Sequence, residues 1–138
     1  MPIPRDGAAY IWVTWLTRLL AGESSCEWSA WFRAQNQVYD RVPDDFDSAA
    51  WTLKHTALLN EVRPRLEADD YEVFSENQNK FSLKSQRTGV TLGGKPDLIA
   101  TKQGAGAVID VKTGRPKASD PTQVMIYMWA VPYALQQY

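Results

Sequence analysis

The sequence predicts an α/β fold in which helices cover a central mixed sheet of three to four strands. Three observations support this prediction. Apolar residues recur at helical spacing through the first half of the chain, alternate with polar residues from Tyr71 onward, and return to helical spacing near the C-terminal end. The order is therefore an extra N-terminal helical section, a run of strands and a closing helix, which implies a sheet flanked by helices.

The first helix is expected over residues 9–20. Ile11, Trp15 and Leu19 lie at helical spacing there, and Gly22 follows as a helix-ending residue. The tryptophans of the N-terminal helices are interpreted as core or helical-interface residues, with stacking on single-stranded bases as the alternative. They are Trp12, Trp15, Trp28 and Trp31.

Two more helices are expected before residue 70. One covers residues 24–37, where Ser24 and Glu27 form a capping-box pattern. The other covers residues 48–68, and Pro64 should kink it or end its first part. Its core-facing side is expected to hold Ala50, Leu53, Ala57 and Val62.

Strands are expected after residue 70. Residues 71–76 and 80–85 alternate apolar and polar side chains, with a turn at "NQNK" between them. Residues 95–102 and 106–114 form two further strands joined by "QGAG". The last of these is nearly all apolar except for Asp110, so we expect a central strand covered on both faces.

The closing helix is expected to begin at Ser119, with Pro121 in its permitted first turn. The 138 residues are expected to form a single domain, with helices over residues 1–45 and the core over residues 46–138. The chain ends at Tyr138 directly after the closing helix, and we expect it to be a piece of a longer protein.

Composition indicates a soluble globular protein, with 44% hydrophobic and 22% charged residues. No apolar run approaches the roughly 20 residues of a membrane span. The N-terminal residues have polar, Pro and Gly breaks where a signal peptide needs an apolar core. A single cysteine, Cys26, excludes an intrachain disulfide framework and favours a reducing, cytoplasmic setting.

Charge is distributed unevenly along the chain. Residues 1–79 carry 7 Lys/Arg and 13 Asp/Glu, whereas residues 80–117 carry 8 Lys/Arg and only 2 acids, Asp97 and Asp110. The basic segment could present phosphate-binding charge around this pair of carboxylates. A solvated basic face is the alternative, and charge alone does not separate the two.

Asp97, Asp110 and Lys112 are the candidate chemical groups. Side chains at i and i+2 of a strand project to the same face, so Asp110 and Lys112 are expected to point together. If the two strands are neighbours, Asp97 can approach Asp110. Adjacent carboxylates repel unless a proton or a cation lies between them, and oxygen ligands of this kind suit Mg²⁺ or Mn²⁺. A lysine beside such an ion can orient or deprotonate a water against a phosphate.

This pattern resembles the signature of the PD-(D/E)XK nuclease superfamily. Pro96-Asp97 is followed by twelve residues and then by Asp110-Val111-Lys112, with "TG" directly after it. The resemblance implies a restriction-endonuclease-like core and metal-dependent hydrolysis of DNA phosphodiester bonds with Mg²⁺ or Mn²⁺.

Two residues of the closing helix extend the resemblance to the RecB-like branch, which includes CRISPR-associated and AddB-type exonuclease domains. Gln123 and Tyr127 are four residues apart and so share a helix face. By themselves they would be a polar residue and a core tyrosine. In the RecB-like branch, however, a Q-x-x-x-Y motif follows D-x-K-T-G at this distance and faces the active site. That branch also carries a metal-binding histidine on an upstream helix, where His55 lies here.

The resemblance assigns a role to each matching position. His55, Asp97, Asp110 and the carbonyl of Val111 would be metal ligands, and Lys112 would position the attacking water. Gln123 and Tyr127 would hold phosphate or support Lys112. Apart from the resemblance, the basic residues that could meet the DNA backbone are Lys95, Arg115 and Lys117, and for Arg115 and Lys117 plain loop charges are an equal alternative.

Two glutamates and the cysteine are less distinctive. Glu61 and Glu76 are interpreted as solvated surface residues, with the alternative that Glu76, at the end of an expected strand, is an acid that supports the metal ligands. Cys26 is either a buried small hydrophobe or, by resemblance to RecB-like nucleases that carry a 4Fe–4S cluster, one ligand of a cluster completed only in a longer parent chain.

The function expected from these residues is a metal-dependent DNA nuclease, RecB-like, acting as an exonuclease or a processing nuclease. Its DNA would be the principal partner, with further protein partners in a repair or defence complex. The alternative is a nuclease-fold DNA-binding domain or subunit that is inactive without a missing C-terminal part or a partner. An unrelated α/β domain and a site-specific restriction endonuclease are less consistent with the ordered motifs.

Overall fold

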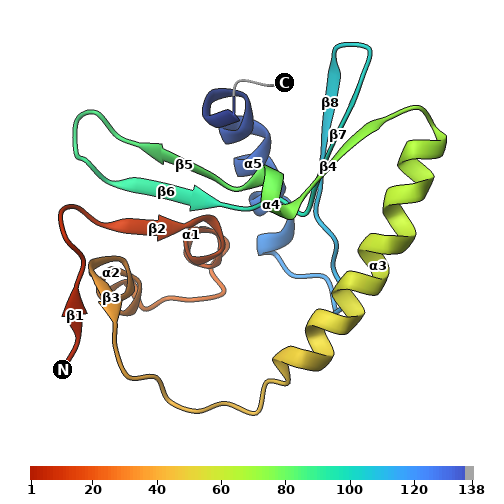
Figure 1. Cartoon of the computed structure of the whole chain (residues 1–138). Coiled ribbons are helices and arrows are strands. Elements are labelled where there is room, and N and C mark those ends of the chain that lie inside the picture. Colours follow the sequence, from red (N-terminus) through yellow and green to blue (C-terminus); the bar gives the residue numbers. More distant parts are fainter. Residues whose placement is uncertain (136–138) are drawn as a thin grey trace.

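The computed structural model describes residues 1–135, whose helices and strands are shown in Figure 1. In chain order the elements are β1 (Ile3–Pro4), β2 (Tyr10–Trp12), α1 (Val13–Leu20), α2 (Glu27–Gln35), β3 (Asn36–Val38), α3 (Ser48–Ala68), β4 (Glu72–Ser75), α4 (Glu76–Asn79), β5 (Phe81–Lys84), β6 (Thr91–Gly94), β7 (Leu98–Lys102), β8 (Ala105–Ile109) and α5 (Ser119–Leu135). Within this part of the chain, no helix combines the length and the apolar character needed to cross a bilayer.

The strands form one two-stranded and two three-stranded sheets. The mixed sheet has the order β2-β6-β5, with β2 parallel and β5 antiparallel to β6. The antiparallel sheet has the order β4-β7-β8, and β1 pairs with β3. The prediction of an α/β fold with a mixed sheet flanked by helices is therefore confirmed.

Helices cover both faces of the β4-β7-β8 sheet. On one face, Val73, Leu98 and Ala100 pack against Leu59 and other apolar residues of α3. On the opposite face, Ile99 joins a core cluster with residues of α1, β5 and α5. Figure 1 shows α3 along one side of this sheet and α5 behind it. Because successive strand residues alternate between faces, the apolar run Leu98–Ala100 serves both layers.

The central strand of this sheet is β7, not the strand that contains the D-x-K pattern. Residues 98–100 of β7 are almost fully buried, whereas the first three residues of β8 are exposed. In the described chain β8 pairs only with β7, so it is an edge strand. The expectation of a central strand over residues 106–114 is wrong, because an apolar run does not reveal how many neighbours a strand has.

The N-terminal section contains strands as well as helices. Tyr10–Trp12, expected as the start of a helix, forms β2 and pairs with Thr91–Gly93 of β6. The aromatic and β-branched residues of this segment favour a strand when a partner is present. β6 itself was not expected from the sequence, since its glycines weaken the strand pattern.

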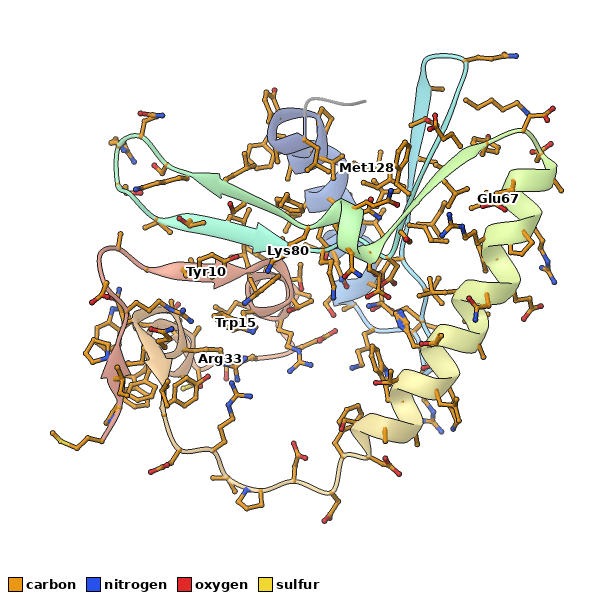
Figure 2. All side chains as sticks on the ribbon, viewed as in Figure 1. Tyr10, Trp15, Arg33, Glu67, Lys80 and Met128 are labelled. Atoms are coloured by element: carbon orange, nitrogen blue, oxygen red, sulfur yellow. The ribbon has the colours of Figure 1, made fainter. Side chains whose placement is uncertain are left out.

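α2 begins later than expected, after Cys26 rather than after Ser24. The backbone N–H of Ser24 donates to the Arg18 carbonyl and so belongs to the turn that ends α1, where Gly22 has a φ of 76°. The helix cap is Cys26, whose Sγ accepts the backbone N–H of Ser29 over 3.4 Å. Arg33 of this helix lies over the Trp15 ring, 5.2 Å from its centroid (Figure 2).

α3 covers the residues expected for it and continues through Pro64 as one helix. Asp47 caps it by accepting the Ala50 N–H over 3.0 Å. Its packed face differs from the expected one, because Leu53 is 73% exposed and His55 is the buried residue. Glu67, near the C-terminal end of α3 (Figure 2), is exposed and pairs with Arg63. The residues of α3 that pack against the sheet are Leu59, Val62 and Leu66.

Candidate active site

Three carboxylates meet at one edge of the β4-β7-β8 sheet. The ladder ends with Ser75 opposite Leu98 and with Leu98 opposite Ile109. The next residue beyond each of these positions is acidic: Glu76, Asp97 and Asp110. Antiparallel register therefore places three acidic side chains from three separate segments side by side.

The β7–β8 hairpin sets the spacing between the first aspartate and the D-x-K segment. Its two turn residues, Gln103 and Gly104, have φ values of 50° and 81°, as a tight two-residue turn requires. Beyond the open end of the hairpin, Asp97 Oδ2 accepts the backbone N–H of Val111 over 2.8 Å. The expected approach of Asp97 and Asp110 follows from this register.

Asp110 and Lys112 do not lie in a strand. β8 ends at Ile109, and the chain leaves the ladder because Val111 donates its N–H to the Asp97 side chain instead of to a strand partner. The two side chains nevertheless meet, with Lys112 Nζ 2.8 Å from Asp110 Oδ2. The expectation of a shared strand face was wrong, although these two groups are neighbours.

His55 brings a nitrogen to the acidic cluster from α3. Its Nε2 lies 3.3 Å from Asp97 Oδ1 and 4.0 Å from Glu76 Oε1, and its side chain is 8% exposed. Trp51, one turn earlier, stands edge-on to the imidazole with ring centroids 4.6 Å apart. One ligand atom from each of His55, Glu76 and Asp97 falls within 4.8 Å of the others, a spacing that a single cation could bridge.

Glu76 lies in the acidic cluster, which favours the alternative interpretation of this residue over the preferred one. It was assigned to the solvated surface together with Glu61, yet its carboxylate contacts both His55 and Lys95. Of these two glutamates, Glu61 is the exposed one, and on α3 it pairs with Arg65 over 2.7 Å. The sequence signal for Glu76 is its position at the end of a strand. That this strand pairs with the Asp97 strand is visible only in the structure.

Burial raises the pKa of the Asp97 carboxyl to about 7, and the neighbouring charge of Asp110 adds to this effect. The Val111 N–H acts in the opposite direction by stabilising the ionised form. A positive charge placed beside Asp97 would stabilise its ionised form and so oppose the effect of burial.

Gln123 connects the lysine to the rest of the site. Its Oε1 accepts a hydrogen bond from Lys112 Nζ over 3.0 Å, and its Nε2 donates to Tyr127 Oη over 3.3 Å and to Asp110 Oδ1 over 3.5 Å. Gln123 and Tyr127 are both buried on α5. Burial raises the pKa of Tyr127, which keeps its hydroxyl neutral.

Two buried polar atoms of the site have capacity for a ligand. Among residues 1–135, neither His55 Nε2 nor Asp110 Oδ2 makes a hydrogen bond, although each lies near a charged group. Buried groups of this kind normally have a partner. Imidazole nitrogen and carboxylate oxygen are suitable donors for Mn²⁺, and carboxylate oxygen for Mg²⁺. The residues present therefore fit a divalent cation.

The remaining predicted site residues lie around this centre. Lys95 Nζ pairs with Glu76 Oε2 over 3.4 Å. Arg115 and Lys117 lie on the loop between β8 and α5 and line a cavity that also reaches Lys112. Cys26 is exposed at the start of α2, so its interpretation as a buried hydrophobe is wrong.

A sequence model of the PD-(D/E)XK nuclease superfamily matches residues 14–137, a span that contains all the residues of the acidic cluster and the Gln123–Tyr127 pair. Comparison with curated proteins finds no match, and neither does comparison with solved structures.

Proposed function

Because the chain belongs to the PD-(D/E)XK nuclease superfamily, we propose that it is a metal-dependent deoxyribonuclease of the RecB-like type, acting as an exonuclease or a processing nuclease. The observation that carries this proposal is the meeting of His55, Asp97 and Asp110 with a lysine that is held by Gln123. The Gln123–Tyr127 pair favours the RecB-like branch, since both side chains face the site from one helix.

His55, Asp97 and Asp110 are the proposed metal ligands, with the Val111 carbonyl and Glu76 as further oxygen donors. A divalent cation at this position would supply positive charge against a phosphate and lower the pKa of a water there. Asp97 is fixed for this role by the Val111 N–H, and His55 by the Trp51 ring packed against it.

Lys112 is the proposed water-positioning residue. Its ammonium is held between Asp110 and Gln123, at 2.8 and 3.0 Å, so it has a defined position beside the carboxylates. From there it can donate a hydrogen bond to the attacking water and offset the charge that develops on the phosphate. Tyr127 supports this arrangement through Gln123, because its buried hydroxyl accepts a hydrogen bond from the amide.

A nuclease-fold DNA-binding domain or subunit is the alternative function. The assignment of Cys26 to an iron–sulfur cluster stays a prediction for a longer chain, because one thiol does not fit a cluster that needs four.

The test is cleavage of end-labelled DNA in Mn²⁺, Mg²⁺ or EDTA by the wild type, Asp110→Asn and the control Glu61→Gln. We expect metal-dependent cleavage by the wild type and by Glu61→Gln, and none by Asp110→Asn. Absence of cleavage together with a Mn²⁺-dependent rise in the wild-type Tm would support the alternative function. Absence of both cleavage and metal binding would reject the nuclease proposal.

A further inference from the structure

A cavity of about 490 Å³ opens directly beside Lys112 and Gln123. Four segments line it: α1, the start of α3 with the residues before it, the loop after β8, and the first turns of α5. Its volume falls within the range of about 300–1,000 Å³ that is typical of small-molecule sites. Because its lining includes Val111, Lys112 and Gln123 of the proposed active site, a group bound here would adjoin the phosphate being cleaved.

Two of the lining side chains are aromatic, Phe46 and Trp51. Phe46 is 62% exposed and Trp51 is 46% exposed, although both are large apolar residues. Trp51 also contacts the His55 ring, so its indole lies between the cavity and the acidic cluster. Exposed aromatic surface beside a reaction centre is suited to stacking on a planar group.

Cationic side chains also line the cavity. Arg18 comes from α1, and Arg115 and Lys117 come from the loop that also carries Lys112. These groups are the usual contacts of a phosphate backbone. Asp120 is the one acidic residue among the lining residues, and it lies 4.0 Å from the Lys112 ammonium.

The charge near the aromatic and the cationic residues differs, which orients a ligand. Phe46 and Trp51 follow Asp44 and Asp47, respectively, in the chain, and the carboxylates of these aspartates accept the backbone N–H groups of Phe46 and Ala50. These negative charges disfavour a phosphate near the aromatic rings. A ligand with a planar ring at one end and a phosphate at the other therefore fits with its ring on Trp51 and its phosphate toward Arg115 and Lys117.

We infer that this cavity binds one unpaired nucleotide of the DNA strand, with its base on Trp51 and Phe46 and its phosphate on Arg115 and Lys117. In a duplex the faces of each base are covered by its neighbours, whereas a single strand or a frayed end can present a free face. The inference rests on the proposed nuclease function and adds a substrate class to it: single-stranded DNA, or a duplex end that has opened.

The test separates binding from cleavage by measuring DNA affinity in EDTA. Fluorescence anisotropy is recorded with a labelled single-stranded oligonucleotide and with the same sequence in a duplex whose ends are closed by hairpin loops. The variants are Trp51→Leu and Phe46→Leu, which remove a ring, and Trp51→Phe, which keeps one. Trp129→Leu is the matched control, because Trp129 is 58% exposed and does not line the cavity.

We expect the wild type to prefer the single strand and Trp51→Leu to lose about 5- to 100-fold in affinity for it. Phe46→Leu should weaken the same complex, Trp51→Phe should retain most of the affinity, and Trp129→Leu should match the wild type. Phe46 precedes α3, so its variant tests the inference even if Trp51→Leu perturbs His55.

Equal affinity for single strand and duplex, or wild-type affinity in both ring-removing variants, would overturn the inference. These outcomes are independent of the nuclease test. A wild type that cleaves DNA without this preference would keep the proposed function and lose the nucleotide site. A wild type that prefers single strands through Trp51 and Phe46 but does not cleave in Mn²⁺ or Mg²⁺ would keep the site and lose the function.

Discussion

Gln123 holds the ammonium of Lys112 through a hydrogen bond of 3.0 Å and is itself tied to Tyr127 on the next turn of α5. The lysine side chain is 42% exposed, so without this contact only Asp110 would restrain it closely. The helix that follows the D-x-K segment thus fixes the position of the group proposed to orient the attacking water.

Substitution Gln123→Ala should lower kcat by about 10- to 100-fold, because Lys112 loses the amide that positions it. KM should change less, since Gln123 is 7% exposed and the nucleotide contacts proposed above come from other lining residues. Steady-state cleavage of a labelled oligonucleotide measures both constants. Gln86→Ala, at an exposed position between β5 and β6, is the control. A kcat equal to that of the wild type would remove the positioning role.

Glu76 and Glu61 should differ in their effect on metal affinity. Glu76 lies 4.0 Å from His55 Nε2, so Glu76→Gln should weaken Mn²⁺ binding by about 10- to 100-fold. Glu61 pairs with Arg65 on the surface of α3, so Glu61→Gln should bind Mn²⁺ like the wild type. Isothermal titration with MnCl₂ measures the two affinities. Equal affinity in both variants would place Glu76 outside the metal site.

The pKa of Asp97 predicts how stability depends on pH in the absence of metal. Folding raises this pKa from 3.8 to about 7, so the folded state binds a proton that the unfolded state releases. The resulting stabilisation is complete below about pH 4 and is lost as the pH rises through about 7.

Asp97→Asn carries no titrating group at this position, so it should not show the loss of unfolding free energy that Asp97 causes over that pH range. At about pH 8 in EDTA it should be more stable than the wild type by about 1–2 kcal/mol, after allowance for the partial exposure of the site. The difference should shrink toward about pH 4. Urea unfolding at several pH values measures it, and a difference independent of pH would contradict the assigned cause.

Gly94 leaves room for two aromatic rings beside the site. A Cβ at this position would lie 2.8 Å from ring atoms of both Phe81 and Tyr127, which are buried. Gly94→Ala should therefore cost about 1–3 kcal/mol of unfolding free energy through overpacking. At Gly106 the nearest such atom is 4.0 Å away, so Gly106→Ala should change stability by less than about 0.5 kcal/mol. Equal Tm values for the two variants would contradict the packing.

Much of the fold could be predicted from the sequence where one local signal dominates. α3 has the predicted bounds, and the alternation through β4 and β5 indicated strands. Tyr10–Trp12 was assigned to a helix because its apolar residues continue the spacing of α1, and only its parallel partner β6 makes it a strand. Pairing over about 80 residues of chain cannot be inferred from a local pattern.

The candidate site could be predicted in composition but not in detail. The Pro96-Asp97 pair and the D-x-K pattern predicted that Asp97, Asp110 and Lys112 lie close together, without knowledge of the strand register. The surface interpretation was preferred for Glu76 because its position depends on β4 pairing with β7, which places it opposite Asp97. Trp51 was missed because its contact with His55 becomes meaningful only when the neighbouring cavity is visible.

The most direct test of the proposed mechanism is to measure Mn²⁺ affinity and DNA cleavage on the same preparation of Lys112→Ala. Lys112 pairs with Asp110 but is not a proposed metal ligand, so its removal should not weaken Mn²⁺ binding. Cleavage should fall by about 10²- to 10⁴-fold if the ammonium orients the attacking water. Wild-type cleavage by this variant, or loss of Mn²⁺ binding together with cleavage, would contradict the division of roles between the lysine and the acidic cluster.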